Sequence, residues 1–296
     1  MKDAFSSFHP AVNFVWFALV IFFSMFFLHP VFLTVSLVCS FCYSVRLGGG
    51  KAMRFNLLYM LPMLLVMAAL NPAFNHAGVT VLFYLKNGNP VTLESVLFGL
   101  ASAVMFVSVI VWFSCYHAVM TSDKFIYLFG RVIPSLSLVL SMVLRLVPRY
   151  KAQIRVISGA QKGIGRDVTS GSMMERAKNG MRILSIMTTW ALENAIETAD
   201  SMKSRGYGLK GRTSFSLFRF EGRDAAALAV LLCLGGFLLI GAAVGQTAMR
   251  FFPSVRLPVV TALSFFLYAA YLGLCLMPVI IDAAEELKWN SLRSKI

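Results

Sequence analysis

The sequence predicts an all-α fold, that of a polytopic α-helical membrane protein. Of its 296 residues, 58% are hydrophobic and only 14% are charged, whereas about a quarter of a soluble domain is usually charged. Stretches without any Asp, Glu, Lys or Arg cover residues 5–45, 95–120, 225–249 and 257–281. Each of the last three has about 25 residues, enough at about 1.5 Å per residue to cross a hydrocarbon core of roughly 30 Å.

Six spans follow from these stretches and from the polar breaks between them. We expect spans at residues 11–28, 31–45, 55–70, 95–120, 225–249 and 257–281. The first one is not read as a removable signal peptide, because it lacks an A-x-A-like cleavage site and continues through His29-Pro30 into the second. The predicted domains are an N-terminal membrane domain of about four spans (1–120), a cytoplasmic segment (121–224), and the last spans with a cytoplasmic tail (225–296).

The basic residues predict the orientation of these spans. Of the 27 Lys and Arg residues, 24 fall on one side: in the N-terminus, the expected 46–54 loop, the 121–224 segment and the C-terminal tail. The other side has only Lys86, Arg250 and Arg256. The positive-inside rule then places both termini and the 121–224 segment in the cytoplasm, with the chain in the cell membrane.

The sequence argues against several classes of function. The net charge of +14 follows from this asymmetry and suits contact with membrane lipid, whereas no nucleic-acid binding module is present. There is no G-x-x-x-x-G-K-[ST] loop for ATP and no H-E-x-x-H pair. The predicted spans contain no ionisable Asp, Glu, Lys or Arg that could serve catalysis or a proton relay. We therefore expect no enzyme, no cofactor and no metal site, and interpret Cys39-x-x-Cys42 as small buried residues.

The 121–224 segment predicts two long helices. An apolar helix covers 132–150, with Pro134 in its first turn. Pro148 predicts a break, followed by a polar helix over 149–162, and the glycines of 163–171 predict a turn.

The second long helix has clear start and stop signals. Ser172 followed by Glu175 forms a capping box, and Gly206 supplies a left-handed C-cap. Small residues recur every four positions at Ala191, Ala195 and Ala199, a pattern that allows close approach of another helix. The two helices are therefore expected to lie beside or across each other.

Several stretches resemble the transmembrane T component of energy-coupling factor (ECF) transporters. They are "HPAVNF" before the first span, "SMVLRLVPRY" and "SGAQKG" in the first long helix, and "ALENAIETADSMKSRGYG" at the end of the second. In that family two cytoplasmic coupling helices cross, and each ends in an X-Arg-X tripeptide whose arginine enters a groove on one of two ABC ATPase subunits.

The resemblance implies which residues dock. Ser204-Arg205-Gly206 matches the second tripeptide. Gly163-Ile164-Gly165 stands where the first is expected, but without the central arginine, and Arg166 follows. Either Arg166 takes over the role or that end docks without an equivalent charge. Arginine suits such a plug because its planar fork can make bidentate hydrogen bonds to a carboxylate and stays charged.

The resemblance also implies the function and the partners. The chain would be the non-catalytic coupling subunit of an ECF-type importer, with two ABC ATPase subunits and a substrate-binding S component as partners and energy supplied by the ATPases. The S component would choose the cargo, a vitamin or a transition-metal ion. The alternative is the pore-forming permease subunit of a conventional ABC importer.

Overall fold

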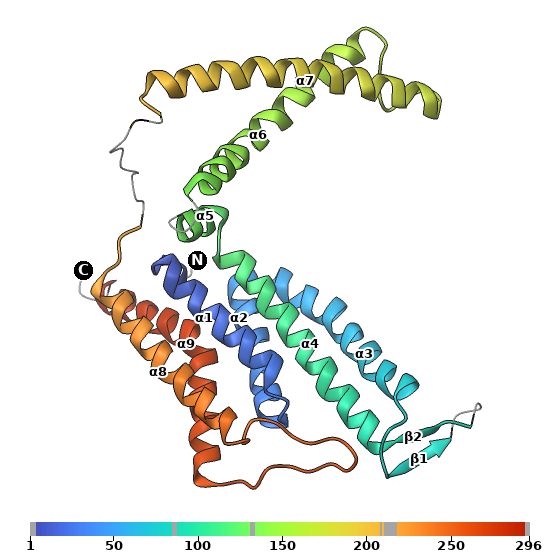
Figure 1. Cartoon of the computed structure of the whole chain (residues 1–296), viewed down its shortest axis with the longest axis vertical. Coiled ribbons are helices and arrows are strands. Elements are labelled where there is room, and N and C mark those ends of the chain that lie inside the picture. Colours follow the sequence, from blue (N-terminus) through green and yellow to red (C-terminus); the bar gives the residue numbers. More distant parts are fainter. Residues whose placement is uncertain (1–3, 85–87, 131–133, 208, 210–217, 294–296) are drawn as a thin grey trace. The chain divides into compact units, whose positions relative to one another are not determined.

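The computed structural model describes residues 4–84, 88–130, 134–207, 209 and 218–293. The chain divides into two compact units (Figure 1). Unit 1 comprises Met1–Phe125 and Phe218–Ile296, and unit 2 comprises Ile126–Leu217. The residues Lys2, Lys86, Val132 and Lys295, which support the predicted topology and helix bounds, lie outside the described residues.

Unit 1 is built from apolar helices with one small hairpin. Its elements are η1 (Phe5–Ser7), α1 (Pro10–Phe26), α2 (Pro30–Phe55), the π-helical η2 (Asn56–Met60), α3 (Leu61–Phe74), β1 (Val81–Tyr84), β2 (Pro90–Thr92), α4 (Leu93–Val119), α8 (Gly222–Ala243) and α9 (Ala262–Arg293), while α5 (Ser122–Gly130) crosses into unit 2. Prolines open α1 and α2, where a missing backbone N–H costs nothing, and the ring nitrogen of the preceding histidine accepts a hydrogen bond from the helix start.

The helices of unit 1 confirm the predicted polytopic membrane protein. Among the described residues, four helical stretches are long and apolar enough to span a membrane: Pro30–Phe74, Leu93–Val119, Gly222–Ala243 and Ala262–Arg293. Pro10–Phe26 is equally apolar but has 17 residues. The last helix continues well beyond the predicted span end at residue 281, to Arg293.

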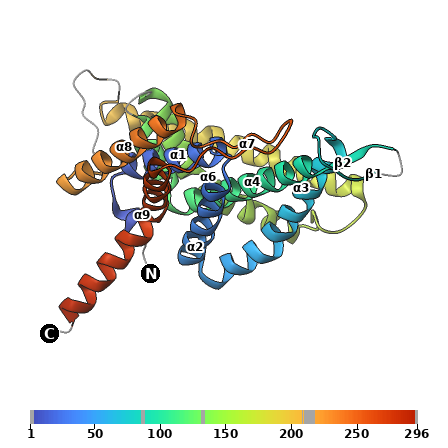
Figure 2. The same cartoon turned by 90° about the horizontal axis from the view of Figure 1, so that it is seen from below.

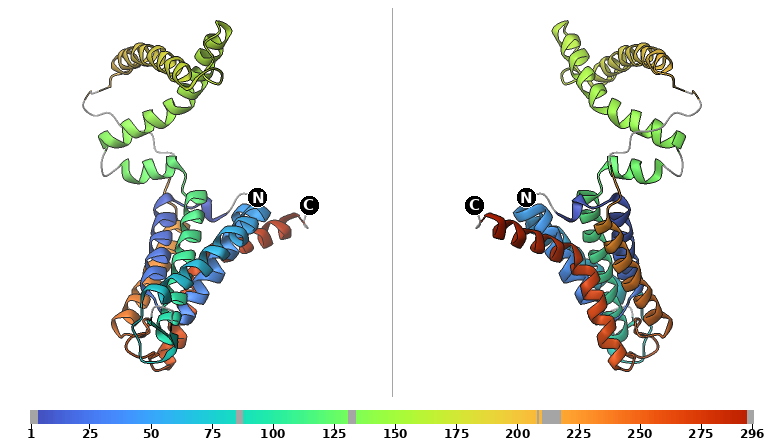
Figure 3. Two further views of the ribbon diagram at one scale, coloured as in Figure 1. Left: turned by 90° about the vertical axis from the view of Figure 1, so that its right-hand side faces the viewer. Right: turned by 90° about the vertical axis from the view of Figure 1, so that its left-hand side faces the viewer.

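The connection expected at residues 46–54 is a bend within helical backbone and not the loop that we predicted. These residues belong to α2, which continues into η2 and α3 without a coil segment. The change of direction is confined to Gly49, whose φ of 58° and ψ of −145° are not helical. Glycine adopts this conformation without a Cβ clash, so one residue replaces a loop. Figures 2 and 3 show α2 and α3 as the two arms of this bend.

The core of unit 1 is aromatic, and its two buried tryptophans have hydrogen-bond partners. Trp16 and Trp112 are fully buried and meet edge to face, with 5.5 Å between ring centroids. The indole of Trp16 donates to the carbonyl of Leu274 at 2.8 Å, and that of Trp112 donates to the hydroxyl of Ser36 at 3.0 Å. Since lipid offers no hydrogen-bond partners, such internal pairing is required within a membrane core.

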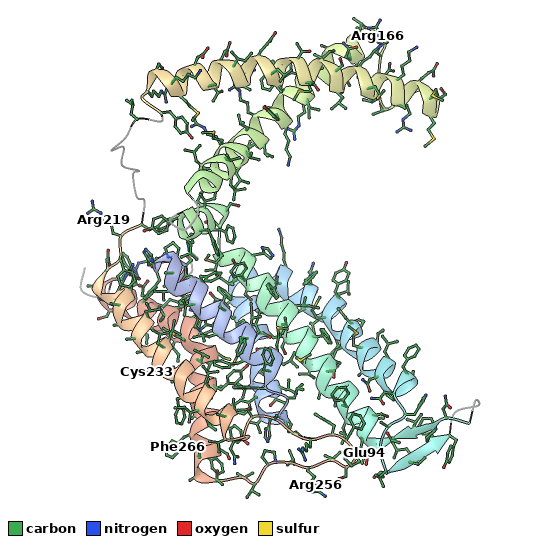
Figure 4. The ribbon with its side chains drawn as sticks, in the orientation of Figure 1. Glu94, Arg166, Arg219, Cys233, Arg256 and Phe266 are labelled. Atoms are coloured by element: carbon green, nitrogen blue, oxygen red, sulfur yellow. The ribbon has the colours of Figure 1, made fainter. Side chains whose placement is uncertain are left out.

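Basic side chains of unit 1 gather at one of its ends. Successive helices run in alternating directions (Figure 3), so the start of α1, the Gly49 bend, the end of α4, the start of α8 and the end of α9 share one end. The described basic residues of these segments are Arg46, Lys51, Arg54, Lys124, Arg219, Arg223, Lys288 and Arg293. Arg250 and Arg256, one of which is labelled in Figure 4, lie in the α8–α9 connection at the other end.

Charged side chains fasten the N-terminal residues 4–9 to the helix ends of unit 1. Asp282 of α9 accepts backbone N–H groups at the start of this segment, at 2.8 and 3.3 Å. Lys124 of α5 donates to a backbone carbonyl in its middle at 2.6 Å, and Asp224 of α8 accepts a backbone N–H at its end at 3.1 Å. We call residues 4–9 with these three side chains the N-terminal clasp.

Unit 2 contains two long helices that cross, α6 (Pro134–Gly163) and α7 (Met173–Ser204), as Figure 1 shows. The break predicted at Pro148 is wrong, because α6 continues through this proline for another 15 residues. A proline removes a single backbone hydrogen bond, and the helix on both sides keeps its own. From Pro134 on, the apolar helix and the polar helix predicted on the two sides of Pro148 are therefore one element.

A small hydrophobic cluster forms the α6–α7 contact. Ile157 of α6 is buried against Ile183 and Met187 of α7. Beside them Tyr150 and Trp190 meet edge to face, with ring centroids 5.4 Å apart. This contact holds the two helices together where they cross.

Candidate functional site

The start of α7 carries the predicted capping box. The hydroxyl of Ser172 accepts the backbone N–H of Glu175 at 3.3 Å, and the carboxylate of Glu175 accepts the backbone N–H of Ser172 at 2.9 Å. The second bond stabilises the ionised carboxylate and holds the pKa of Glu175 below its usual value. Ser172 and Glu175 could be identified from the sequence because a capping box involves only residues close together along the chain.

The end of α7 closes in a Schellman motif at Arg205. Gly206 has a φ of 75°, the left-handed conformation predicted for the C-cap. The N–H of Tyr207 donates to the carbonyl of Met202 at 3.0 Å, and the N–H of Gly206 donates to that of Lys203 at 2.9 Å. These bonds satisfy carbonyls that a helix end otherwise leaves open, so the tip is a defined piece of backbone.

The end of α6 closes in the same motif. Gly165 has a φ of 78°. The N–H of Arg166 donates to the carbonyl of Gln161 at 2.9 Å, and the N–H of Gly165 donates to that of Lys162 at 3.0 Å. Figure 4 labels Arg166 on the turn that joins α6 to α7. The two long helices of unit 2 thus end in tips of identical hydrogen-bond pattern.

Matching the hydrogen bonds of the two tips pairs their residues one by one. Ile164 takes the position of Arg205, and Arg166 takes that of Tyr207. The residue before the central position is small in both tips, and the residue after it is the left-handed glycine. The resemblance had already set Gly163-Ile164-Gly165 against Ser204-Arg205-Gly206, and both share the pattern Lys-small-X-Gly at residues 162–165 and 203–206. The hydrogen bonds add that Arg166 corresponds to Tyr207.

The central side chains of both tips are exposed. Arg205 is exposed, and its guanidinium has no hydrogen bond or ion pair to any residue that the structure describes. Ile164 is 62% exposed. A guanidinium held on a rigid helix end can bind a carboxylate bidentately, and an isoleucine held there can only fill an apolar pocket.

An acidic residue neutralises part of the α6 tip. Asp167 lies 3.2 Å from the ammonium group of Lys162. Its carboxylate also accepts the backbone N–H of Thr169 at 2.9 Å, and mainly this bond lowers the pKa of Asp167 from its usual value. The turn is tied to α7 through backbone carbonyls, which accept from Arg176 at 2.9 Å and from Asn179 at 3.1 Å.

The predicted alanine stripe lies apart from the α6–α7 cluster. Ala191 is half-buried, whereas Ala195 and Ala199 are exposed. The buried side chains of α7, Ile183 and Met187, come earlier along the helix. A packing role for the alanine stripe therefore stays a prediction.

The structure also locates the Cys39-x-x-Cys42 pair of unit 1. Cys39 is buried and Cys42 is exposed, so the expectation that both are buried is wrong for Cys42. The described residues contain no group of three or more His, Cys, Asp or Glu that could hold a metal ion.

Comparison with known proteins finds relatives of one kind. No family model matches the chain. The chain is 36% identical over 109 residues to the energy-coupling factor transporter transmembrane protein EcfT of Lactobacillus helveticus, covering 36% of this chain and 39% of the relative. Proteins of the same name are 38% identical over 104 residues in Listeria innocua and 34% over 104 residues in Bacillus subtilis, each covering 35% of this chain and 39% of the relative.

The predicted resemblance to the ECF T component is confirmed. The chain matches about two fifths of the length of these curated relatives. Their names describe a transmembrane subunit of a transporter, in keeping with the apolar helices of unit 1. Membrane-spanning helices are therefore supported for this chain, and its part in transport and the roles of individual residues are developed below as proposals.

Proposed function

We propose that this chain is the non-catalytic coupling subunit of an ECF-type importer. Unit 1 lies in the cell membrane and holds a substrate-binding S component. The tips of α6 and α7 dock on a pair of ABC ATPase subunits on the cytoplasmic side. The chain itself binds neither ATP nor cargo, so the energy comes from the ATPases.

The observation that carries this proposal is the pair of equivalent, exposed tips on two crossed helices. Each tip has a fixed backbone, and Arg205 presents its guanidinium to the outside. Within the described part of unit 2 this guanidinium has no ion-pair partner. It suits a carboxylate on a partner, where a buried pair has high geometric specificity.

The α6–α7 contact explains how movement is passed on. Ile157, Ile183 and Met187 join the helices near their crossing, so displacement of one tip rotates the pair as a body. When the ATPases close on ATP, the crossed helices tilt, and the S component reorients to release a vitamin or a transition-metal ion into the cytoplasm. The exposed alanines Ala195 and Ala199 are candidates for the surface that slides during this movement.

The orientation of the chain follows from its charges. The end of unit 1 that gathers Arg46, Lys51, Arg54 and Arg223 faces the cytoplasm, because cytoplasmic loops of membrane proteins are enriched in Lys and Arg. Both termini lie on that side in this arrangement, together with unit 2 and its docking tips.

Charge reversal at the α7 tip tests the proposal. Arg205→Glu should insert into the membrane normally, since the residue is exposed. It should nevertheless lose the ATPases on affinity purification in mild detergent, and uptake should fall at least tenfold. The reason is that reversing one member of a buried ion pair strands the partner charge, at a cost of about 3–5 kcal/mol.

Lys151→Glu is the matched control. Lys151 is an exposed cation on α6, well before the α6 tip, so this variant should keep the ATPases and wild-type uptake. Full ATPase recovery and uptake with Arg205→Glu would refute the docking role of this arginine. Recovery of the chain without any ATPase, even for the wild type, would refute the coupling function itself.

A further inference from the structure

The two tips of unit 2 have the same backbone and different central side chains. Arg205 is a cation, and Ile164, which holds the same position in the hydrogen-bond pattern, is apolar. We propose that Ile164 is an apolar plug, and that the ATPase half which receives the α6 tip offers an apolar notch in place of an acidic one. This inference rests on the proposed coupling function and specifies the partner of one of its tips.

The exposure of Ile164 is the first argument. It is 62% exposed although an apolar cluster lies on the same helix at Ile157, so the fold has not buried it. An exposed isoleucine on a rigid tip gains from removal from water when a partner covers it. A carboxylate facing it would lose its hydration without gaining a partner, which favours an apolar notch over an acidic one.

The glycines beside Ile164 are the second, independent argument. Gly163 lies in helical backbone, and a Cβ built on it meets nothing within 4 Å. The fold therefore does not require glycine there, and alanine would suit the helix better. Gly159, four residues earlier and hence on the same face, has equally open surroundings. This face of α6 has no side chains at these two positions although the fold leaves room for them. Such a face indicates the close approach of another molecule.

The charges of the α6 tip point the same way. Lys162 is paired with Asp167 at 3.2 Å, so the base of this tip is internally neutralised. Arg166 is exposed but sits at the position of Tyr207, two residues beyond the central one. It can contact the rim of a notch, whereas Ile164 enters it. The two ATPase halves must then differ in their notches, and the chain binds the pair in one orientation only.

Photocrosslinking from the equivalent positions 166 and 207 tests the notches directly. A photoreactive phenylalanine derivative replaces Arg166 in one full-length variant and Tyr207 in another, which leaves both plugs intact. After irradiation in native membranes, the crosslinked ATPase peptides are identified by mass spectrometry. We expect two different peptides, with apolar residues around the site reached from position 166.

Each other outcome separates the inference from the function on which it rests. The same notch peptide from both positions, or an ATPase peptide from position 207 alone, would overturn the apolar plug and leave the coupling function standing. A lack of ATPase crosslinks from both positions would overturn the coupling function, and the plug with it.

Substitution of the plug gives a second, quantitative test. Ile164→Leu should keep ATPase recovery on purification, and Ile164→Arg should lower it at least tenfold. Ile196→Arg is the matched control, since Ile196 is 64% exposed on α7 and should tolerate the same change. Wild-type recovery with Ile164→Arg would show that the notch accepts a cation and would overturn the proposal.

Discussion

One left-handed glycine shapes the backbone of each tip of unit 2, Gly165 at the end of α6 and Gly206 at the end of α7. Gly206 has a φ of 75°, and a Cβ there would meet the side chain of Leu209 at 3.1 Å. Other L-residues pay about 1–2 kcal/mol for left-handed backbone. We therefore expect Gly206→Ala to loosen the end of α7, with amide hydrogen exchange at Arg205 and Tyr207 at least fivefold faster than in the wild type.

Gly159→Ala is the control for that change. Gly159 is helical and its surroundings are open, so alanine should leave exchange at the α6 tip unchanged or slow it slightly. Unchanged exchange at the α7 tip in Gly206→Ala would mean that the left-handed conformation contributes nothing to the stability of the tip.

At the scale of residues, the sequence reveals what is decided locally. Ser172, Glu175 and Gly206 were predicted because a cap depends on a few neighbouring residues and their backbone groups. The correspondence of Arg166 with Tyr207 was not, because it depends on which carbonyl each amide reaches. A motif centred on arginine also draws attention to Arg166, which the hydrogen bonds place two positions later.

The next scale is that of α6 and α7, whose crossing depends on one small cluster. Ile183 is 8% exposed, whereas Ile186 of the same helix is 40% exposed. Ile183→Asp places a carboxylate among apolar side chains and should destabilise the crossing by about 2 kcal/mol or more. Limited trypsin digestion should then cut after Arg155 at least tenfold faster, because α6 loses its contact with α7.

The same substitution at Ile186 provides the comparison. Ile186→Asp changes the charge of α7 equally but at an exposed position, and its digestion should match that of the wild type. Equal digestion of both variants would show that the cluster does not hold the pair together.

Among the elements, long apolar helices were predictable and the connections were not. The uncharged stretches located α1, α4, α8 and α9, since composition alone decides which segments can lie in lipid. Gly49 and Pro148 show the limit of local rules. A glycine inside a helical stretch reverses the chain at one residue, and a proline that usually marks a helix end is carried within α6. The β1–β2 hairpin was missed because its strands have only four and three residues.

For the molecule as a whole, the distribution of Lys and Arg predicts which end faces the cytoplasm. A variant without its five cysteines can carry a single new one at Val259, in the α8–α9 connection, or at Thr169, in the α6–α7 turn. A membrane-impermeant thiol reagent should label Val259→Cys in intact cells, and Thr169→Cys only after permeabilisation. The cysteine-free parent should stay unlabelled, and the reverse pattern would invert the topology.

The parity of the spans was predictable because it requires only that charged loops alternate along the chain. The arrangement of unit 1 was not, since the pairing of Trp112 with Ser36 joins residues 76 positions apart. Such contacts depend on the three-dimensional course of the helices, about which a single sequence says little.

The N-terminal clasp has a mechanical consequence for the two points at which the chain leaves and re-enters unit 1. The chain leaves unit 1 just after Lys124 and re-enters it just before Asp224, and both side chains hold the same short stretch, residues 4–9. A pull on either connection thus reaches the bundle through one shared anchor. Release of residues 4–9 would therefore free Lys124 and Asp224, the two side chains of unit 1 that lie beside these connections, at the same time.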